Sequence, residues 1–158
     1  MRLSALCLFA VCCCCCSLVN AAATAAAAKT DQGRKLQEVL RQLSDVKDSV
    51  QFNEKMLSSP PENIEDCCCL SALECFRANM QVHLNVTGRK LHKLLRSLKN
   101  PLTLSGLDSC KSGNDTVRGN LTCHDCDSHP KVNVQEFFNR LESLIQRVRI
   151  SSLILSCS

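Results

Sequence analysis

Four stretches of the chain place apolar residues three and four positions apart, which is the spacing of an amphipathic helix. The first stretch runs from about Asp31 to Lys55, with a charged face opposite its apolar stripe. Its stripe consists of Leu36, Val39, Leu40, Leu43, Val46 and Val50. We predict that this helix ends before Pro60 and Pro61, because consecutive prolines cannot continue a helix.

Two further helices are predicted in the middle of the chain. The second begins near Asp66, a plausible N-cap, and turns Cys69, Leu73, Phe76 and Met80 inward. The third covers residues 89–99, has leucines on one side and basic residues on the other, and is stopped by Pro101. The polar stretch 103–129 has no helical period, so we predict a long connection there.

The last predicted helix has the clearest start. Asn133 can cap it, and Glu136 stands where its carboxylate can reach back, as in a capping box. Its stripe consists of Phe137, Phe138, Leu141, Leu144, Ile145 and Val148. Because each helix is apolar on one stripe only, the four should pack together as an all-α four-helix bundle, and the long connection permits an up-up-down-down topology.

The N-terminus predicts secretion. Arg2 precedes an uncharged, mostly apolar segment over residues 3–19, and small residues follow. We interpret residues 1–23 as a signal peptide, cleaved at a position between 21 and 28, and residues 29–158 as the folded, four-helix domain. A membrane anchor is the alternative, but the alanine-rich exit favours cleavage. We therefore expect a secreted, extracellular monomer without membrane insertion after cleavage.

Fourteen cysteines are present, and six of them lie within the predicted signal peptide. Among the others, Cys68 and Cys75 share one helix face, and Cys123 and Cys126 form a C-x-x-C pair before the last helix. Disulfides Cys68–Cys123 and Cys75–Cys126 could therefore form in parallel. One alternative is a zinc site formed by Cys67, Cys68, Cys123 and Cys126, with His124 and His129 nearby, and another is a redox C-x-x-C. The sequence does not choose partners for the remaining cysteines, which are Cys67, Cys69, Cys110 and Cys157.

Other patterns narrow the function. Three N-x-[ST] sequons predict glycosylation at Asn85, Asn114 and Asn120, all in predicted connections. The formal net charge of +4 and the lack of aromatics among basic residues argue against a nucleic-acid partner. No catalytic or phosphate-binding motif occurs, so we expect neither an enzyme nor a cofactor.

Several segments resemble the interleukin-2/15/21 family of cytokines, and its interleukin-21 branch most closely. Residues 68–76 carry a C-x6-C-F pattern, and residues 59–65, 121–128, 136–138 and 143–146 also match. The resemblance covers roughly residues 34 to 150. It implies a short-chain four-helix cytokine with up-up-down-down topology and the two disulfides named above.

The resemblance also implies a function. Such a protein would bind a private, interleukin-21-type receptor chain and the common cytokine-receptor γ chain, and would activate Janus kinases in lymphocytes. An interleukin-15-like cytokine is the alternative within the family. A secreted helical carrier of apolar ligands is a more distant one.

The family match places a γ-chain contact on the last helix. Gln146 matches the glutamine that the family uses there, and Asn139 lies on the same face. Arg149 stands where the interleukin-21 branch has an apolar contact, and Ile150 could take over that role. A neutral amide can form hydrogen bonds at an interface without desolvating a charge.

For the private chain, the family uses the first and third helices. The corresponding residues here are Arg34, Lys35, Glu38, Arg41, Lys93, Arg96 and Lys99. Lys35 matches a basic contact of the branch, whereas Arg41 replaces an acidic residue. A basic face suits an acidic receptor surface, although a solvated charged face is the simpler interpretation.

Overall fold

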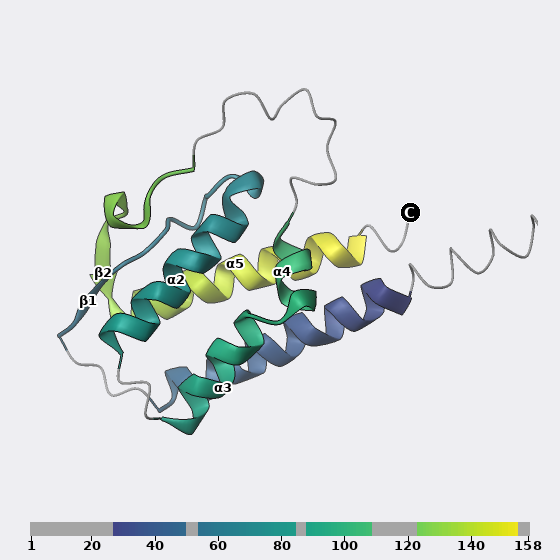
Figure 1. Ribbon diagram of the computed structural model, residues 1–158, viewed down its shortest axis with the longest axis horizontal. Coiled ribbons are helices and arrows are strands. Elements are labelled where there is room, and N and C mark those ends of the chain that lie inside the picture. Colours follow the sequence, from purple (N-terminus) through teal and green to yellow (C-terminus); the bar gives the residue numbers. More distant parts are fainter. Residues whose placement is uncertain (1–26, 50–53, 85–87, 109–122, 155–158) are drawn as a thin grey trace, which may run out of the picture.

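The computed structural model describes residues 27–49, 54–84, 88–108 and 123–154 (Figure 1). The predicted signal peptide and all three sequons lie outside these residues, as do Cys110 and Cys157. Within them, no helix is sufficiently long and apolar to cross a membrane.

The fold is mostly helical, as the apolar stripes predicted. An N-terminal helix spans residues 27–47. It is followed by α2 (Cys69–His83), α3 (Arg89–Leu98), the short α4 (Pro101–Leu107) and the long α5 (Val134–Ile154). Two short 3₁₀ helices, η1 (Asp66–Cys68) and η4 (Cys126–Ser128), precede α2 and α5.

The core forms where the predicted stripes meet. Phe76 of α2 packs edge-on against Phe137 of α5 with ring centroids 5.0 Å apart, and Phe137 contacts Phe138 in the same way. Fully buried leucines from the other helices complete this cluster, among them Leu36, Leu43, Leu94, Leu98 and Leu107. Burial of these stripes is the main force that holds such helices together, because single amphipathic helices are marginal in water.

The first helix ends earlier than predicted. It stops at residue 47, whereas the prediction continued it to about Lys55, and the strand β1 (Met56–Ser58) follows just beyond that point. β1 pairs antiparallel with β2 (Lys131–Asn133), with Leu57 opposite Val132. Leu57 is buried in the core, so the extended backbone gains a hydrophobic contact as well as hydrogen bonds.

The connection before α5 is also more structured than predicted. Pro101 ends α3 as predicted, but it also begins α4. At the first position of a helix the backbone N–H has no partner within the helix, so a proline there loses no hydrogen bond. Asn100 caps this helix through its side chain, which accepts a hydrogen bond from the Leu102 amide at 2.9 Å. The buried Thr103 hydroxyl donates to the Ser97 carbonyl at 2.8 Å, which ties α4 back to α3.

Half of the expected capping box is present at α5. The Asn133 side chain accepts a hydrogen bond from the Glu136 amide at 2.8 Å. The Glu136 carboxylate instead accepts from Arg140 Nε at 2.8 Å. Arg140 also donates to the Ser59 carbonyl at 3.4 Å, so the first turns of α5 hold the connection that precedes α2.

Two disulfides join α2 and its preceding turn to the segment before α5. They link Cys68 to Cys123 and Cys75 to Cys126, the pairs that the spacing allowed. Each cysteine of the C-x-x-C pair is therefore bonded to the α2 region and not to its neighbour. The zinc alternative loses three of its thiolates to these bridges, and no group of three potential ligands gathers among the described residues.

Candidate functional site

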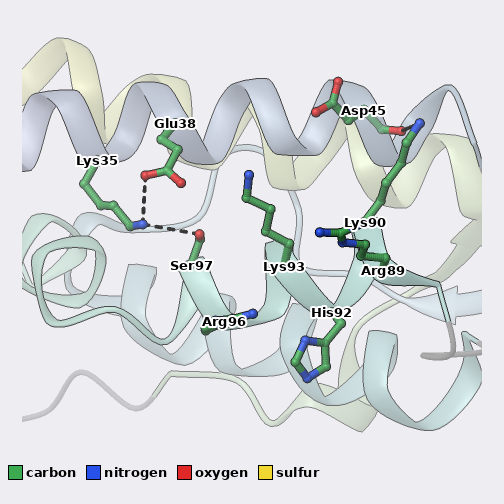
Figure 2. A pocket seen from close by; sticks show the side chains of 9 residues that line it. All are labelled: Lys35, Glu38, Asp45, Arg89, Lys90, His92, Lys93, Arg96 and Ser97. Atoms are coloured by element: carbon green, nitrogen blue, oxygen red, sulfur yellow. Dashed lines mark hydrogen bonds and ion pairs between the residues drawn. The ribbon is translucent and has the colours of Figure 1, made fainter.

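A basic groove lies between the N-terminal helix and α3. Its volume is about 630 Å³. Figure 2 shows side chains from both helices turned toward it. We call it the basic groove and define it by its lining residues, which are Lys35, Glu38, Asp45, Arg89, Lys90, His92, Lys93, Arg96 and Ser97.

Lys35 connects the two helices that form the basic groove. Its ammonium donates to Glu38 Oε2 at 3.0 Å and to the Ser97 hydroxyl at 3.3 Å, and so links the N-terminal helix to α3. Glu38 also accepts a hydrogen bond from the buried Gln42 amide at 2.6 Å. The bond from Lys35 lowers the pKa of the Glu38 carboxyl against the opposing effect of burial, so Glu38 is negatively charged here.

The wall formed by α3 is strongly cationic. Lys93 extends toward the N-terminal helix, and Arg89 and Lys90 lie at one end of the groove (Figure 2). Lys90 donates to the Asp45 backbone carbonyl at 3.2 Å. The helix contains no acidic residue, and no ion pair within the described part of the chain uses one of its cations.

The structure brings together four of the seven residues expected to contact a private receptor chain. Lys35 and Glu38 come from the N-terminal helix, and Lys93 and Arg96 come from α3. The other three do not line the basic groove.

Those three residues lie on exposed surface outside the groove. Arg34 forms an exposed ion pair with Asp31 at 3.6 Å, and Arg41 forms one with Asp45 at 3.6 Å. Exposed pairs of this kind contribute little stability. Lys99 is exposed just beyond the end of α3.

Sequence reasoning missed several lining residues. Arg89 could have been found, since it precedes Lys93 by one helical turn on a helix whose exposed positions are nearly all basic. Asp45 and Ser97 carry no such signal, because only the packing of the two helices brings them to the same groove.

A second surface lies on α5 around Gln146. This residue is exposed, and its amide donates to Glu142 Oε1 at 3.2 Å. The other oxygen of Glu142 pairs with Lys47 of the N-terminal helix at 2.7 Å. Gln146 is therefore part of a network of three side chains, of which sequence reasoning identified only one.

The other residues predicted for this surface differ in exposure. Ile150 is 57% exposed, which makes it an apolar contact available to a partner. Asn139 and Arg149 are both half-buried. An exposed amide beside an exposed isoleucine suits a protein interface, where hydrogen bonding and apolar burial combine.

The two surfaces differ in chemistry. The basic groove presents ammonium and guanidinium donors for carboxylate, phosphate or sulfate groups, whereas the α5 surface presents a neutral amide and an aliphatic side chain. No protein-family model matches the chain.

Proposed function

We propose that this protein is a secreted, interleukin-21-like cytokine of the interleukin-2/15/21 family. It brings a private receptor chain and the common cytokine-receptor γ chain together, and thereby activates Janus kinases in lymphocytes. The observation that carries the proposal is the basic groove, in which Lys35 and Glu38 meet Lys93 and Arg96 from another helix. These residues were expected, from the sequence resemblance, to contact one receptor chain.

The arrangement of helices supports an up-up-down-down bundle. In Figure 1 the sequence colours advance in one direction along the N-terminal helix and α2, and in the opposite direction along α3 and α5. Long connections precede α2 and α5, as this topology requires. The two disulfides fit an oxidising, extracellular environment.

Receptor cross-linking needs two separate binding surfaces, and the N-terminal helix has a different neighbour on each side. Lys35 and Glu38 face α3 across the basic groove, whereas Lys47 pairs with Glu142 of α5. The private chain would bind the basic groove, and the γ chain would bind the α5 surface. One molecule could thus hold both receptor chains at once.

Gln146→Asp tests the assignment of the α5 surface. The new carboxylate would lie beside Glu142, which now accepts a hydrogen bond from the Gln146 amide, and would place an uncompensated charge in the interface. We expect unchanged binding of the private-chain ectodomain and loss of signalling in cells that carry both receptor chains. Surface plasmon resonance and phosphorylation of the receptor-associated kinases measure the two effects.

Gln81→Asp is the matched control, because Gln81 is an exposed glutamine on α2. It should leave both binding and signalling unchanged. Full signalling by the Gln146 variant would disprove the γ-chain assignment. Binding of an interleukin-15-type private chain in preference to an interleukin-21-type chain would favour the alternative cytokine.

A further inference from the structure

We infer that the basic groove binds a sulfated polysaccharide, and that this polysaccharide competes there with the private receptor chain. The binding itself is argued from the groove alone. The competition rests on the proposed function, because it assumes that the receptor uses the same side chains.

Positive charge is concentrated on and just beyond α3. Five of the 19 Lys and Arg residues of the whole chain lie within residues 89–99, where no Asp or Glu occurs, and all of these except Lys99 line the basic groove. The formal net charge of the whole chain is only +4, so the remainder of the molecule is close to neutral. Because the α3 cations form no ion pair within the described residues, their charge is available to a ligand.

The spacing of the cations suits a ligand with repeated anionic groups. Arg89, Lys93 and Arg96 follow one another at successive turns of α3, which distributes them over roughly 10 Å of the helix axis. Lys35 adds a cation from the opposite wall. A sulfated chain lying in the groove would meet these groups in turn, and the guanidinium groups can each donate two parallel hydrogen bonds to an oxyanion.

Other polyanions fit the groove less well. Single-stranded nucleic acids are usually held by aromatic stacking as well as charge, but the chain has no Trp or Tyr, and Phe76, Phe137 and Phe138 are buried in the core. A membrane surface is flat, whereas this site is hollow, and no large apolar residue lines it. A sulfated polysaccharide needs neither stacking nor apolar contact.

Two carboxylates oppose polyanion binding within the groove. Glu38 is held between Lys35 and Gln42, and Asp45 lies further along the same helix. Glu38→Gln removes the negative charge but keeps a hydrogen-bond acceptor for Lys35. This substitution should therefore tighten polysaccharide binding, an effect that a damaged fold would not produce.

The direct test is calorimetric titration of the full secreted protein with a heparin-derived octasaccharide near physiological salt. Lys93→Glu and Arg96→Glu should each weaken binding by about tenfold, Glu38→Gln should strengthen it, and affinity should fall steeply with added salt. Lys131→Glu is the matched control, since it makes the same charge change at an exposed site on β2 and should alter affinity by less than about threefold. Equal losses of octasaccharide affinity in the Lys93→Glu and Lys131→Glu variants would disprove binding at the basic groove.

Three further probes test the identity of the ligand. A desulfated octasaccharide should bind at least tenfold more weakly, and a thymidine oligonucleotide and phosphatidylserine-containing vesicles should also bind more weakly than the sulfated octasaccharide. Tighter binding of the oligonucleotide or the vesicles would overturn the assignment to a polysaccharide.

A competition experiment separates this inference from the proposed function. The octasaccharide should displace the private-chain ectodomain from the wild-type protein. Octasaccharide binding without any binding of the private chain would refute the proposed function and leave the polysaccharide site standing. Private-chain binding without octasaccharide binding would refute the polysaccharide site alone.

Discussion

At the scale of single residues, His129 shows how burial controls charge in this molecule. It is the most buried of the four histidines and packs edge-on against His124, with ring centroids 6.2 Å apart. Burial lowers the pKa of His129, and the neighbouring imidazole of His124 lowers it further. The folded protein therefore favours the neutral ring.

This shift predicts that the protein loses stability in mild acid. Between the unfolded pKa of about 6.5 and the lower folded pKa, the unfolded chain binds more protons, so the free energy of unfolding decreases as the pH falls through that range. Urea unfolding at pH 7.5, 6.5 and 5.5 measures the slope. His129→Gln should flatten it, whereas His92→Gln, at an exposed site, should not. An unchanged slope in the His129 variant would count against this explanation.

At the scale of elements, the start of α5 combines several functions in a few residues. Asn133 is the last residue of β2 and also caps the helix, while Glu136 and Arg140 connect its first turns to Ser59. The backbone of Asn133 belongs to the strand pair and its side chain to the helix. A substitution at this position can thus separate the two contributions.

Asn133→Ala should lower the free energy of unfolding by about 1 kcal/mol, because it leaves the Glu136 amide without its acceptor but preserves the strand backbone. Gln135→Ala, at an exposed position in the first turn of the same helix, should change stability by less than about 0.5 kcal/mol. Guanidinium unfolding followed by circular dichroism compares the two. Equal stability of both variants would show that the cap contributes nothing.

The elements differ in how well the sequence predicts them. The stripes through Leu94 and Phe137 predict α3 and α5, because a helical period is a local pattern that burial then satisfies. β1 is missed because three residues are too few for a period and its partner strand is distant in sequence. α4 is missed because Pro101 ends one helix and starts the next, and a proline permits both interpretations.

The sequence predicts less of the candidate site than of the helices. A basic face on the third helix is visible in the sequence, and the family resemblance points to Lys35. The groove itself is not predictable in this way, because the contact of Lys35 with Ser97 depends on how two helices pack. The same holds for Lys47, because only the packed fold shows that it pairs with Glu142, the carboxylate that accepts the Gln146 hydrogen bond.

At the scale of the whole molecule, the disulfides connect elements that helix packing alone would leave free to separate. The Cys75–Cys126 bridge spans 51 residues, and the Cys68–Cys123 bridge spans 55. Both therefore restrict the unfolded chain over long loops. They do so next to a core that is already well filled by leucine and phenylalanine.

Replacing Cys75 and Cys126 together by serine should reduce the free energy of unfolding by about 3 kcal/mol, through the greater freedom of the unfolded chain. The loss is smaller than for an isolated loop of this length, because the remaining Cys68–Cys123 bridge already closes most of the same loop. The helical circular-dichroism signal of the native state should persist, because the core remains. Chemical denaturation without reductant measures the loss. A loss below about 1 kcal/mol would show that the bridge adds little to the core.

The pairing of β1 with β2 has a consequence for the order of folding. These strands are far apart in sequence, so their pairing requires closure of a long loop, which is entropically costly before the helices pack. Helix docking buries much more apolar surface than one short strand pair, so it should come first and bring the strands together. In the same step it would set Cys68 and Cys75 opposite Cys123 and Cys126. We therefore expect helix packing to determine which thiols form disulfides with each other. The native disulfides would then form only after the helices have packed.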